Sequence, residues 1–537
     1  MKGISKSLMS YYRSHKITLI LISILIFALI LRLYFLVGLV FFDEQDEGIY
    51  FNNALNTLKK GNDFSRYSRM NESYLPNPVE AFSFRTAVYM PLVISFKVFG
   101  INEFSAIFFS LVYSLAGILV VFFIAKIFFG ERVGLIASFL LSFFPLDVLF
   151  STRLMPDIVV SFFVWLGLLF FFMAEKDENN KSTDGKNEIL LYLLSGFSIG
   201  LGYLAKISVY LVLITFVVFF LYNKRIRLRY LYIVLGFLVV FIPEAIYYHN
   251  VSGHFALNSY ISNKVYDQKI THENQEFIDI SSFLRIWYLD GSKTFYYIPS
   301  IFGFLSIDKM SSINYFGFFG YLSIIAIIYL LFRNEKKSYF FIVLFLFLLF
   351  FLEFVPTFFR FFHDGNLIDF IVNKKPRVLT ILILPSVTLI SLLLDKLSKR
   401  TTAAIVFLLF LSSIVFINNG REYSQMGIIS LREAAEFLKS HPEKHVFSDS
   451  LAADTLRIYT GYKINISYFP KNEYEIRDAY IIDYGSRGNS ISPNYIMELR
   501  PPYFENASRN WKIVKIINNP LKYVNKDYKD LVIYYAE

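Results

Sequence analysis

Long apolar runs, separated by short charged segments, dominate the chain up to residue 418. They predict about eleven membrane-spanning helices, since a helix needs roughly 20 apolar residues to cross a bilayer. A shorter apolar segment, Thr86–Phe99, contains Pro91 and Lys97, and we expect it to lie at the membrane interface without crossing. The predicted spans are 17–41, 103–128, 133–150, 157–174, 189–204, 207–222, 230–248, 313–332, 338–355, 377–395 and 402–418.

The pattern changes beyond residue 419 to that of a water-soluble domain. Residues 429–440 predict an amphipathic helix, and five β-branched and aromatic runs predict strands at 445–448, 463–469, 479–484, 511–517 and 530–535. The predicted fold is therefore a polytopic α-helical membrane domain, residues 1–418, followed by a small C-terminal α/β domain, residues 419–537. The second domain has no glycine-rich phosphate loop, so we interpret it as a lid or an acceptor-recognition module.

Basic residues in the loops predict the orientation of the spans. If Thr86–Phe99 does not cross, five basic loops fall on the same side as the N-terminus, which the positive-inside rule assigns to the cytoplasm. Residues 42–102 then form the first external loop, and the C-terminal domain is extracytoplasmic. The first span follows Lys2, Lys6, Arg13 and Lys16 and is too long for a cleaved signal peptide, so we expect a retained anchor in the plasma membrane.

Composition supports this class of protein. Hydrophobic residues make up 55% of the 537 residues, and 61 are phenylalanine. The formal net charge of +10 fits basic cytoplasmic loops, and we expect no nucleic acid partner. The absence of cysteine excludes disulfides and thiolate metal sites.

An acidic stretch, Asp43-Glu44-Gln45-Asp46-Glu47-Gly48-Ile49-Tyr50, follows the first span. Bilayer surfaces are usually anionic and favour nearby lysine and arginine, so four carboxylates at this place need a reason. The stretch continues into a predicted short amphipathic helix on which Glu47, Tyr50 and Ala54 share a face. Two interpretations stay open on spacing alone: a reactive carboxylate, or acidic residues that merely favour a helix N-terminus.

Three further sets of charged residues fall on the same predicted side of the membrane. Arg153 and Asp157 lie in the second external loop, Lys206 lies between two short apolar segments, and Arg377 opens a span that contains Pro385. Any one of these cations could simply extend its side chain to the interface. Together with the acidic loop, they indicate an anion-binding site next to carboxylates.

These residues carry a family resemblance that covers residues 1–400 in order and spacing. The motifs are Asp46-Glu47-x-x-Tyr50-x-x-x-Ala54, Tyr89-Met-Pro91-Leu to Phe96-Lys-Val-Phe-Gly100, Phe144-Pro145, Arg153-x-x-x-Asp157, Gly202-x-x-x-Lys206 and the span opened by Arg377. In these motifs the chain resembles the polyprenyl-phosphate-sugar glycosyltransferases of the GT-C superfamily. The most similar group comprises the protein O-mannosyltransferases and aminoarabinose transferases, glycosyltransferase family 39-like enzymes.

The resemblance implies inverting transfer of a sugar from a dolichyl- or undecaprenyl-phosphate donor to an extracytoplasmic hydroxyl on a protein, glycan or glycolipid. Such a reaction needs a carboxylate to accept the hydroxyl proton and cations to stabilise the departing lipid phosphate. Carried over, Asp46 is the predicted base with Glu47 as its alternative, and Asp157 orients the loop or contacts the acceptor. Arg85, Lys206 and Arg377 are predicted to bind the donor phosphate, with Tyr50 and Arg153 in support.

The sequence departs from the family pattern in two respects. The pair Asp43-Glu44 is additional, and Met90-Pro91 replaces the usual His-Pro or Pro-Pro. The tail lacks the Trp-Trp-Asp motif of oligosaccharyltransferases, which argues against transfer of a whole oligosaccharide to asparagine. His249 and His254, with Asp46, are candidate ligands of a divalent cation, although this spacing is not diagnostic.

Two other classes of function were weighed. A lipid or polysaccharide transporter or flippase would carry charges in mid-helix across the whole bilayer, often in repeated helical halves. Here the charges cluster on one side and no repeat is evident. A scaffold protein with an inactive catalytic fold would not need intact acidic and basic motifs.

Overall fold

The computed structural model describes most of the helical bundle and of the C-terminal sheet. The described residues are 2–36, 47, 50–51, 54–55, 57–58, 85–179, 185–223, 227–252, 255, 316–349, 376–448, 450–461, 463–470, 473–483, 504, 510–520 and 529–537. Within these ranges, seven helices are long and apolar enough to cross a membrane, and an eighth span is possible if one bent pair is counted as one. The chain is an integral membrane protein.

Most predicted spans correspond to helices of the structure. The elements are α1 (Lys2–Tyr34), α4 (Glu103–Phe129), α5 (Glu131–Ser142), α6 (Pro145–Ser151), α7 (Pro156–Asn179), α8 (Gly185–Ala205), α9 (Val212–Asn223), α10 (Leu231–Ser252), α14 (Phe319–Phe332), α16 (Ile383–Lys396) and α17 (Lys399–Lys439). The predicted spans 207–222 and 313–332 correspond to shorter apolar helices, Ser208–Asn223 and Phe319–Phe332. The predicted span 338–355 is helical over 339–349, after which the described residues stop.

Two interruptions of membrane helices shape the bundle. The predicted span 133–150 consists of α5 and α6, which meet at an angle of 57°. Pro145 occupies the first turn of α6, where its missing N–H removes no helical hydrogen bond. The second break lies at Lys206, which adopts an extended conformation between α8 and a 3-10 helix, η4 (Ile207–Leu211).

The segment Thr86–Phe99 forms α3, as the apolar pattern predicts. Its 14 residues span about 21 Å, less than the hydrocarbon core of a bilayer. Asn102 then caps α4, since its side chain accepts a hydrogen bond from the Ser105 amide while the Ser105 hydroxyl accepts one from the Asn102 amide. This capping box fixes where the long helix starts.

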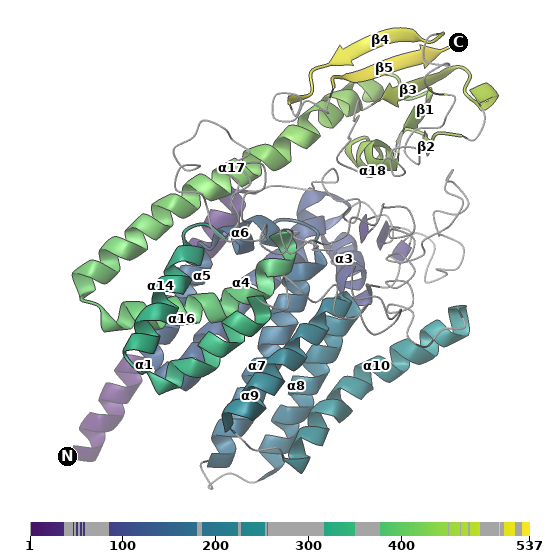
Figure 1. Ribbon diagram of the computed structural model, residues 1–537. Helices are drawn as coiled ribbons and strands as arrows, with labels where there is room; N and C mark the ends of the chain where they lie inside the picture. Colours follow the sequence, from purple (N-terminus) through teal and green to yellow (C-terminus); the bar gives the residue numbers. More distant parts are fainter. Residues whose placement is uncertain are drawn as a thin grey trace, which may run out of the picture.

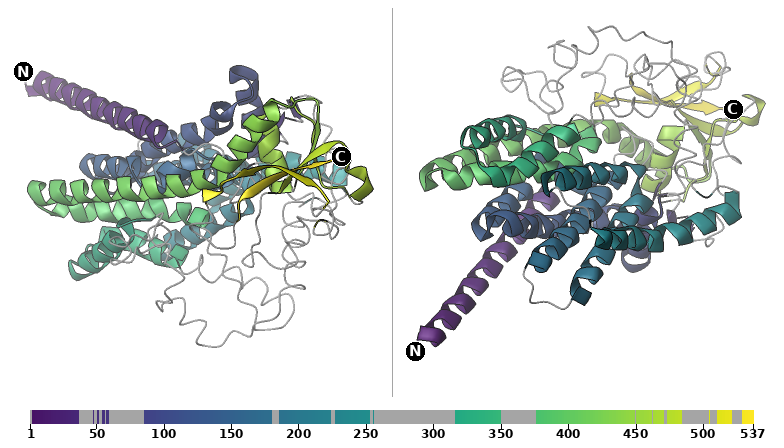
Figure 2. Two further views of the ribbon diagram at one scale, coloured as in Figure 1. Left: turned by 90° about the horizontal axis from the view of Figure 1, so that it is seen from above. Right: turned by 60° about the horizontal axis from the view of Figure 1, so that its bottom comes forward.

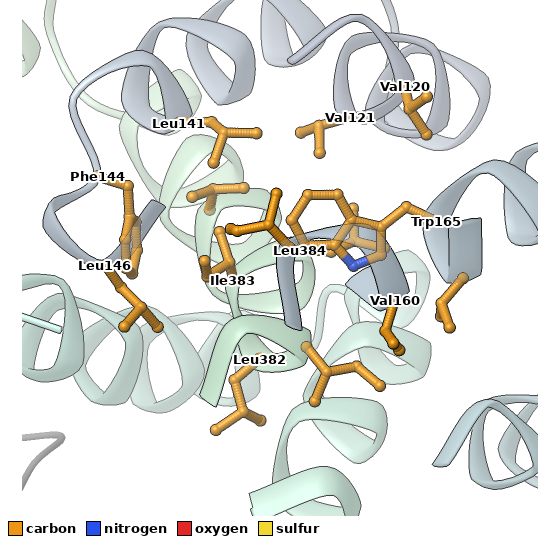
Figure 3. Close-up of a cluster of buried hydrophobic side chains, with 14 of the residues drawn as sticks. Val120, Val121, Leu141, Phe144, Leu146, Val160, Trp165, Leu382, Ile383 and Leu384 are labelled. Atoms are coloured by element: carbon orange, nitrogen blue, oxygen red, sulfur yellow. The ribbon is translucent and has the colours of Figure 1, made fainter. Parts of the chain in front are cut away.

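The core lies where α4, the broken span, α7 and α16 meet (Figure 3). Trp165 of α7 is buried among aliphatic side chains from the other helices, and α4 approaches it at Gly117, where an added Cβ would lie 3.4 Å from the indole. Residues from a further 3-10 helix, η7 (Pro376–Leu382), and the start of α16 complete the cluster. The labelled residues are Val120, Val121, Leu141, Phe144, Leu146, Val160, Trp165, Leu382, Ile383 and Leu384.

The C-terminal domain is a five-stranded mixed sheet in the order β2-β1-β3-β5-β4. Its strands are β1 (His445–Ser448), β2 (Ile466–Tyr468), β3 (Ala479–Asp483), β4 (Lys512–Ile517) and β5 (Leu531–Ala536). The strand β1 pairs in parallel with β2 and β3, and β5 pairs antiparallel with β3 and β4. All five predicted strands are present, with boundaries shifted by a few residues.

Helices pack on this sheet in a way that the hydrophobic pattern predicts only in part. The predicted helix 429–440 is the end of α17, which runs without interruption from Lys399 to Lys439 and so continues through residue 419. The sequence analysis did not predict α18 (Ser450–Tyr459), whose Ala452, Ala453 and Leu456 are fully buried against the sheet.

The N-terminal end of α1 and the C-terminal sheet lie at opposite ends of the molecule (Figure 1). The views in Figure 2 show α1 projecting away from the bundle on the side remote from the sheet. The helices α3 and α6 lie at the end that faces the sheet. At this end Arg432 of α17 forms an ion pair of 3.0 Å with Glu103 at the start of α4.

Candidate active site

The described positions of the predicted loop helix are helical and buried. Glu47, Tyr50, Phe51 and Ala54 are each fully buried, and Leu55 is almost so. At these described positions the structure agrees with the predicted short helix on which Glu47, Tyr50 and Ala54 share a face. The helix therefore packs into the protein with its carboxylate and phenol directed inward.

Glu47 is held by the second loop. Its Oε1 accepts hydrogen bonds from Arg153 Nε at 3.3 Å and from the Leu154 amide at 3.0 Å. The side chains of Glu47 and Arg153 are 0% and 4% exposed, so both charges are shielded from water. A buried charge is costly unless it is paired and hydrogen-bonded, and this pair meets that condition.

Tyr50 contacts Arg85, the residue before α3. An Arg85 guanidinium nitrogen donates a hydrogen bond to the Tyr50 hydroxyl, and the guanidinium carbon lies 5.4 Å from the centre of the ring. The next residue, Thr86, has its hydroxyl 3.4 Å from that of Tyr248 near the end of α10. The loop helix, α3 and α10 thus meet around Arg85.

Asp157 and Lys206 form the second pair. Lys206 Nζ lies 2.7 Å from Asp157 Oδ1, and their side chains are 15% and 3% exposed, respectively. The break after α8 allows this contact because the extended Lys206 leaves the helix axis there. The sequence argument that such a lysine has an anionic partner is confirmed.

The 3-10 helix η7 contacts Asp157 as well, through the Thr380 side chain. The Thr380 hydroxyl accepts a hydrogen bond from Ser161 at 2.7 Å and lies 3.4 Å from the carbonyl oxygen of Asp157. Arg377 is the second residue of η7, three positions before Thr380, and its side chain is outside the described part of the structure. Arg377, the third predicted phosphate-binding cation, therefore lies one helical turn before the residue of η7 that contacts Asp157.

These contacts connect segments that are far apart in the sequence. Arg85 contacts Tyr50, three positions after Glu47 in the sequence. Glu47 contacts Arg153, which lies in the connection just before α7. Asp157, in the first turn of α7, contacts Lys206 and Thr380 of η7. Cations and carboxylates alternate along this path. Such an arrangement can hold an anionic leaving group beside a proton acceptor.

Two predicted site residues, Asp46 and His254, lie outside the described residues, as does the additional pair Asp43-Glu44. The ring of His249 stacks on Phe255, with centres 3.8 Å apart. Among the described residues, no group of three or more His, Cys, Asp or Glu side chains is placed to hold a metal ion.

A buried ion pair between α1 and α6 was not predicted from the sequence. Arg32 of α1 and Asp147 of α6 are 2.5 Å apart, with side chains 0% and 2% exposed. The available signal was a lone arginine inside the first apolar run, because a charge within a membrane span usually has a partner. Asp147 follows the Phe144-Pro145 motif by two residues and lies just outside it.

The chain was compared with known proteins. Residues 88–247 match the family model described as dolichyl-phosphate-mannose-protein mannosyltransferase. The fold matches ArnT from Cupriavidus metallidurans in the apo state with a TM-score of 0.57 and 14% identity, covering 96% of this chain and 97% of ArnT. The chain therefore has the fold of ArnT.

Two further solved structures share this fold. ArnT from the same organism bound to undecaprenyl phosphate matches with a TM-score of 0.57 and 12% identity, covering 95% of this chain and 97% of that one. The archaeal oligosaccharyltransferase AglB from Archaeoglobus fulgidus, in complex with an inhibitory peptide and a dolichol-phosphate, matches with a TM-score of 0.50 and 12% identity. That match covers 88% of this chain and 70% of AglB. No curated protein matches the sequence significantly. The resemblance to GT-C glycosyltransferases that the motifs indicated is confirmed.

Proposed function

We propose that this protein is a membrane glycosyltransferase that moves a sugar from a polyprenyl-phosphate donor to a hydroxyl acceptor with inversion. The observation that carries the proposal is the path of alternating cations and carboxylates from Arg85 to Lys206 within a GT-C fold. The family model of residues 88–247 and the lipid phosphates in the titles of two structural relatives support the donor class.

Asp46 is the proposed base. Its neighbour Glu47 already accepts hydrogen bonds from Arg153 and the Leu154 amide in a buried position, which suits a structural carboxylate better than a proton acceptor. Glu47 is therefore assigned to holding the loop helix against the second loop. The base would take the proton of the acceptor hydroxyl as that oxygen attacks the anomeric carbon and the lipid phosphate departs.

Lys206, Arg85 and Arg377 are the proposed ligands of the donor phosphate. Lys206 keeps 15% of its side chain exposed while Asp157 is nearly buried, so the ammonium is the partner that a ligand can reach. Asp157 then positions Lys206, and Tyr50 positions Arg85 through its hydroxyl. A departing phosphate gains most from cations that are held in place before the reaction starts.

The proposed orientation places this site outside the cytoplasm. The opposite ends of the spans carry Lys126, Arg132, Arg227, Arg229 and Lys396, in agreement with the positive-inside rule. In this orientation the N-terminus is cytoplasmic, and residues 419–537 form an extracytoplasmic domain joined to the catalytic domain 1–418 by α17.

The C-terminal domain is a proposed acceptor-recognition module. A cavity of about 340 Å³ lies between it and the bundle, lined by Phe51, Ile101, Asn102, Glu103, Ile458, Tyr459 and Gly461. Phe51 belongs to the loop helix that carries Glu47, so the cavity borders the candidate site. Acceptor hydroxyls of a protein, glycan or glycolipid would enter from this side.

The test is transfer by the purified protein in lipid nanodiscs. Dolichyl-phosphate mannose and the lipid-phosphate sugars that copurify with the protein are the donors, and release of polyprenyl phosphate is the readout. We expect Asp46→Asn to lower kcat by about 10²–10⁴-fold, the usual contribution of a general base. Asp43→Asn, in the same loop, is the matched control and should retain activity. Full activity of Asp46→Asn would overturn the assignment of the base.

Two additional arms of this assay address alternatives. A divalent cation bound by His249, His254 and Asp46 remains a proposed cofactor, and it requires that EDTA abolish turnover and that Mg²⁺ or Mn²⁺ restore it. A flippase would move the donor lipid across the bilayer of a vesicle without releasing the lipid phosphate. Movement without release would replace the enzyme proposal by the transporter.

A further inference from the structure

The Arg32–Asp147 pair joins four elements at one point within the membrane domain. Arg32 Nε donates to Ser114 Oγ of α4 at 2.9 Å, and one terminal nitrogen, Nη1, donates to the carbonyl oxygen of Ser142 at 2.9 Å. The other terminal nitrogen, Nη2, binds Asp147 Oδ2 of α6 at 2.5 Å, and the Ser114 hydroxyl donates to the same carboxylate oxygen. One guanidinium thus connects α1, α4, α5 and α6.

The contact with Ser142 lies at the bend of the broken span. In an unbroken helix the Ser142 carbonyl would accept a hydrogen bond from residue 146, but α5 ends at Ser142 and α6 starts at Pro145. Arg32 supplies a donor to this carbonyl, so the bend of 57° is hydrogen-bonded from α1. The guanidinium suits this role because its donors are fixed in a planar fork.

In the sequence, Arg32 precedes the loop that carries Glu47, and Asp147 precedes the loop that carries Arg153. Arg32 is two residues from the end of α1, which leads into the loop that carries Asp46 and Glu47. Asp147 is in the first turn of α6, which ends at Ser151 and leads to Arg153, the partner of Glu47. A shift of α6 against α1 would therefore move Arg153, the partner of Glu47.

Stability alone does not account for this arrangement. Apolar residues of similar volume in place of a buried ion pair are often neutral or stabilising, so a buried pair is weak evidence for stability. Both side chains are enclosed, since Arg32 is 0% and Asp147 is 2% exposed, and so neither can reach a ligand. What the pair does provide is a fixed geometry at the bend.

We propose that Arg32 and Asp147 are positioning residues that set α1 against the bent span and thereby hold Arg153 and the Leu154 amide in place for Glu47. The proposal rests on the proposed glycosyltransferase function for its kinetic consequence, but its structural consequence is independent of that function. A small misplacement of reacting groups can cost a hundredfold in rate.

The test is the double apolar variant Arg32→Met/Asp147→Leu, which removes both charges together and so leaves no unpaired buried ion. We expect its melting temperature to stay within about 5 °C of the parent, because such replacements are often tolerated. The kcat for transfer should fall about tenfold or more while KM for the donor changes little, since alignment and not binding is lost. The matched control is Arg132→Met/Asp395→Leu, which removes a partly exposed pair of 3.1 Å between α5 and α16. This control should change neither the melting temperature nor kcat.

Hydrogen exchange of residues 151–157 supplies a readout that needs no substrate. The Leu154 amide donates to Glu47 in the parent, so the double variant should exchange faster in this peptide and not in the peptides of the C-terminal sheet. If the parent shows no transfer, the proposed function fails while this measurement still tests the positioning role.

Arg32→Lys is the second variant, since it keeps a charge for Asp147 and should fold. A lysine cannot contact Ser114, the Ser142 carbonyl and Asp147 in one plane, so kcat and the protection of residues 151–157 should both fall. Unchanged kcat and unchanged protection in folded Arg32→Lys, or in the double variant, would overturn the proposal.

Discussion

At the scale of single residues, the candidate site differs from a cluster of solvated charges because its partners are buried and hydrogen-bonded. Glu47, Arg153 and Asp157 are each at most 3% exposed as residues. Removing one member of a buried pair commonly costs about 3–5 kcal/mol, because the other charge is left uncompensated. The pairs therefore constrain one another, and a substitution must be judged by what it leaves behind.

Substitutions of Lys206 and of Asp157 can distinguish the role of the cation from that of its acidic partner. We expect Lys206→Met to weaken binding of polyprenyl phosphate about tenfold or more, because it removes a proposed phosphate ligand and takes away the cation that pairs with Asp157. Asp157→Asn keeps the ammonium and should retain most of the affinity while lowering kcat. The measurement is the affinity for polyprenyl phosphate in detergent, with Lys396→Met, which breaks a partly exposed pair with Glu335, as the control. Equal losses in the Lys206 and Asp157 variants would contradict the assignment.

At the scale of helices and strands, the sequence predicts the elements well where a single hydrophobic pattern dominates a segment. The apolar runs indicate α1, α4, α7 and α10 because the bilayer requires a long uninterrupted span. The strand β1 was predicted at its observed residues, 445–448, because its run is bounded by polar residues on both sides. The helix α18 was not predicted because it has only 10 residues and no continuous apolar run, although its buried Ala452, Ala453 and Leu456 share one face.

The sequence predicts which charged residues belong to the candidate site, but it does not predict which of them contact one another. The spacing around Lys206 indicates a buried cation that needs an acidic partner, but only the fold shows that the partner is Asp157. The Arg32–Asp147 pair is separated by 115 positions, and no local pattern links the two residues. Long-range pairing depends on how α1 crosses the bent span, which hydrophobic periodicity does not encode.

The packing of α8 against α10 illustrates how small residues set a helix crossing. An added Cβ at Gly196 would lie 1.8 Å from the carbonyl oxygen of Ile233, and one at Gly236 would lie 2.1 Å from that of Leu193. Such distances require that the two backbones touch, as small residues permit in membrane helices. The crossing in turn fixes the end of α8, where Lys206 begins the break.

We therefore expect Gly196→Ala to destabilise the protein by about 1–3 kcal/mol, the usual cost of overpacking, despite the better helix propensity of alanine. Gly117→Ala is the matched control, since its Cβ would make an ordinary contact of 3.4 Å with Trp165. Thermal unfolding in detergent compares the two variants. A melting temperature of Gly196→Ala at or above that of Gly117→Ala would show that the two helices do not approach as closely as described.

At the scale of the whole molecule, α17 connects the membrane bundle to the C-terminal sheet without a break. A Cβ at Gly420 would lie 2.7 Å from a Leu149 side-chain carbon, so this helix packs closely on α6. Farther along, Arg432 pairs with Glu103 of α4 and lies over the ring of Tyr459, 5.1 Å from its centre. Burial raises the pKa of Tyr459, which keeps its phenol neutral beside Glu103. The sheet is thereby attached at the rim of the cavity that borders the loop helix.

This attachment predicts a separation of acceptor recognition from chemistry. Arg432→Ala removes the contacts to both Glu103 and Tyr459, so the fraction of molecules with the domain docked should fall and KM for the acceptor should rise several-fold. Hydrolysis of the donor in the absence of acceptor should stay unchanged, because the path from Arg85 to Lys206 lies entirely in the bundle. Lys515→Ala is the control, since it breaks a pair with Glu433, the next residue of α17, without touching the bundle. If Arg432→Ala lowered donor hydrolysis and left the acceptor KM intact, the C-terminal domain would have to act on the chemical step, and its proposed role in acceptor recognition would be wrong.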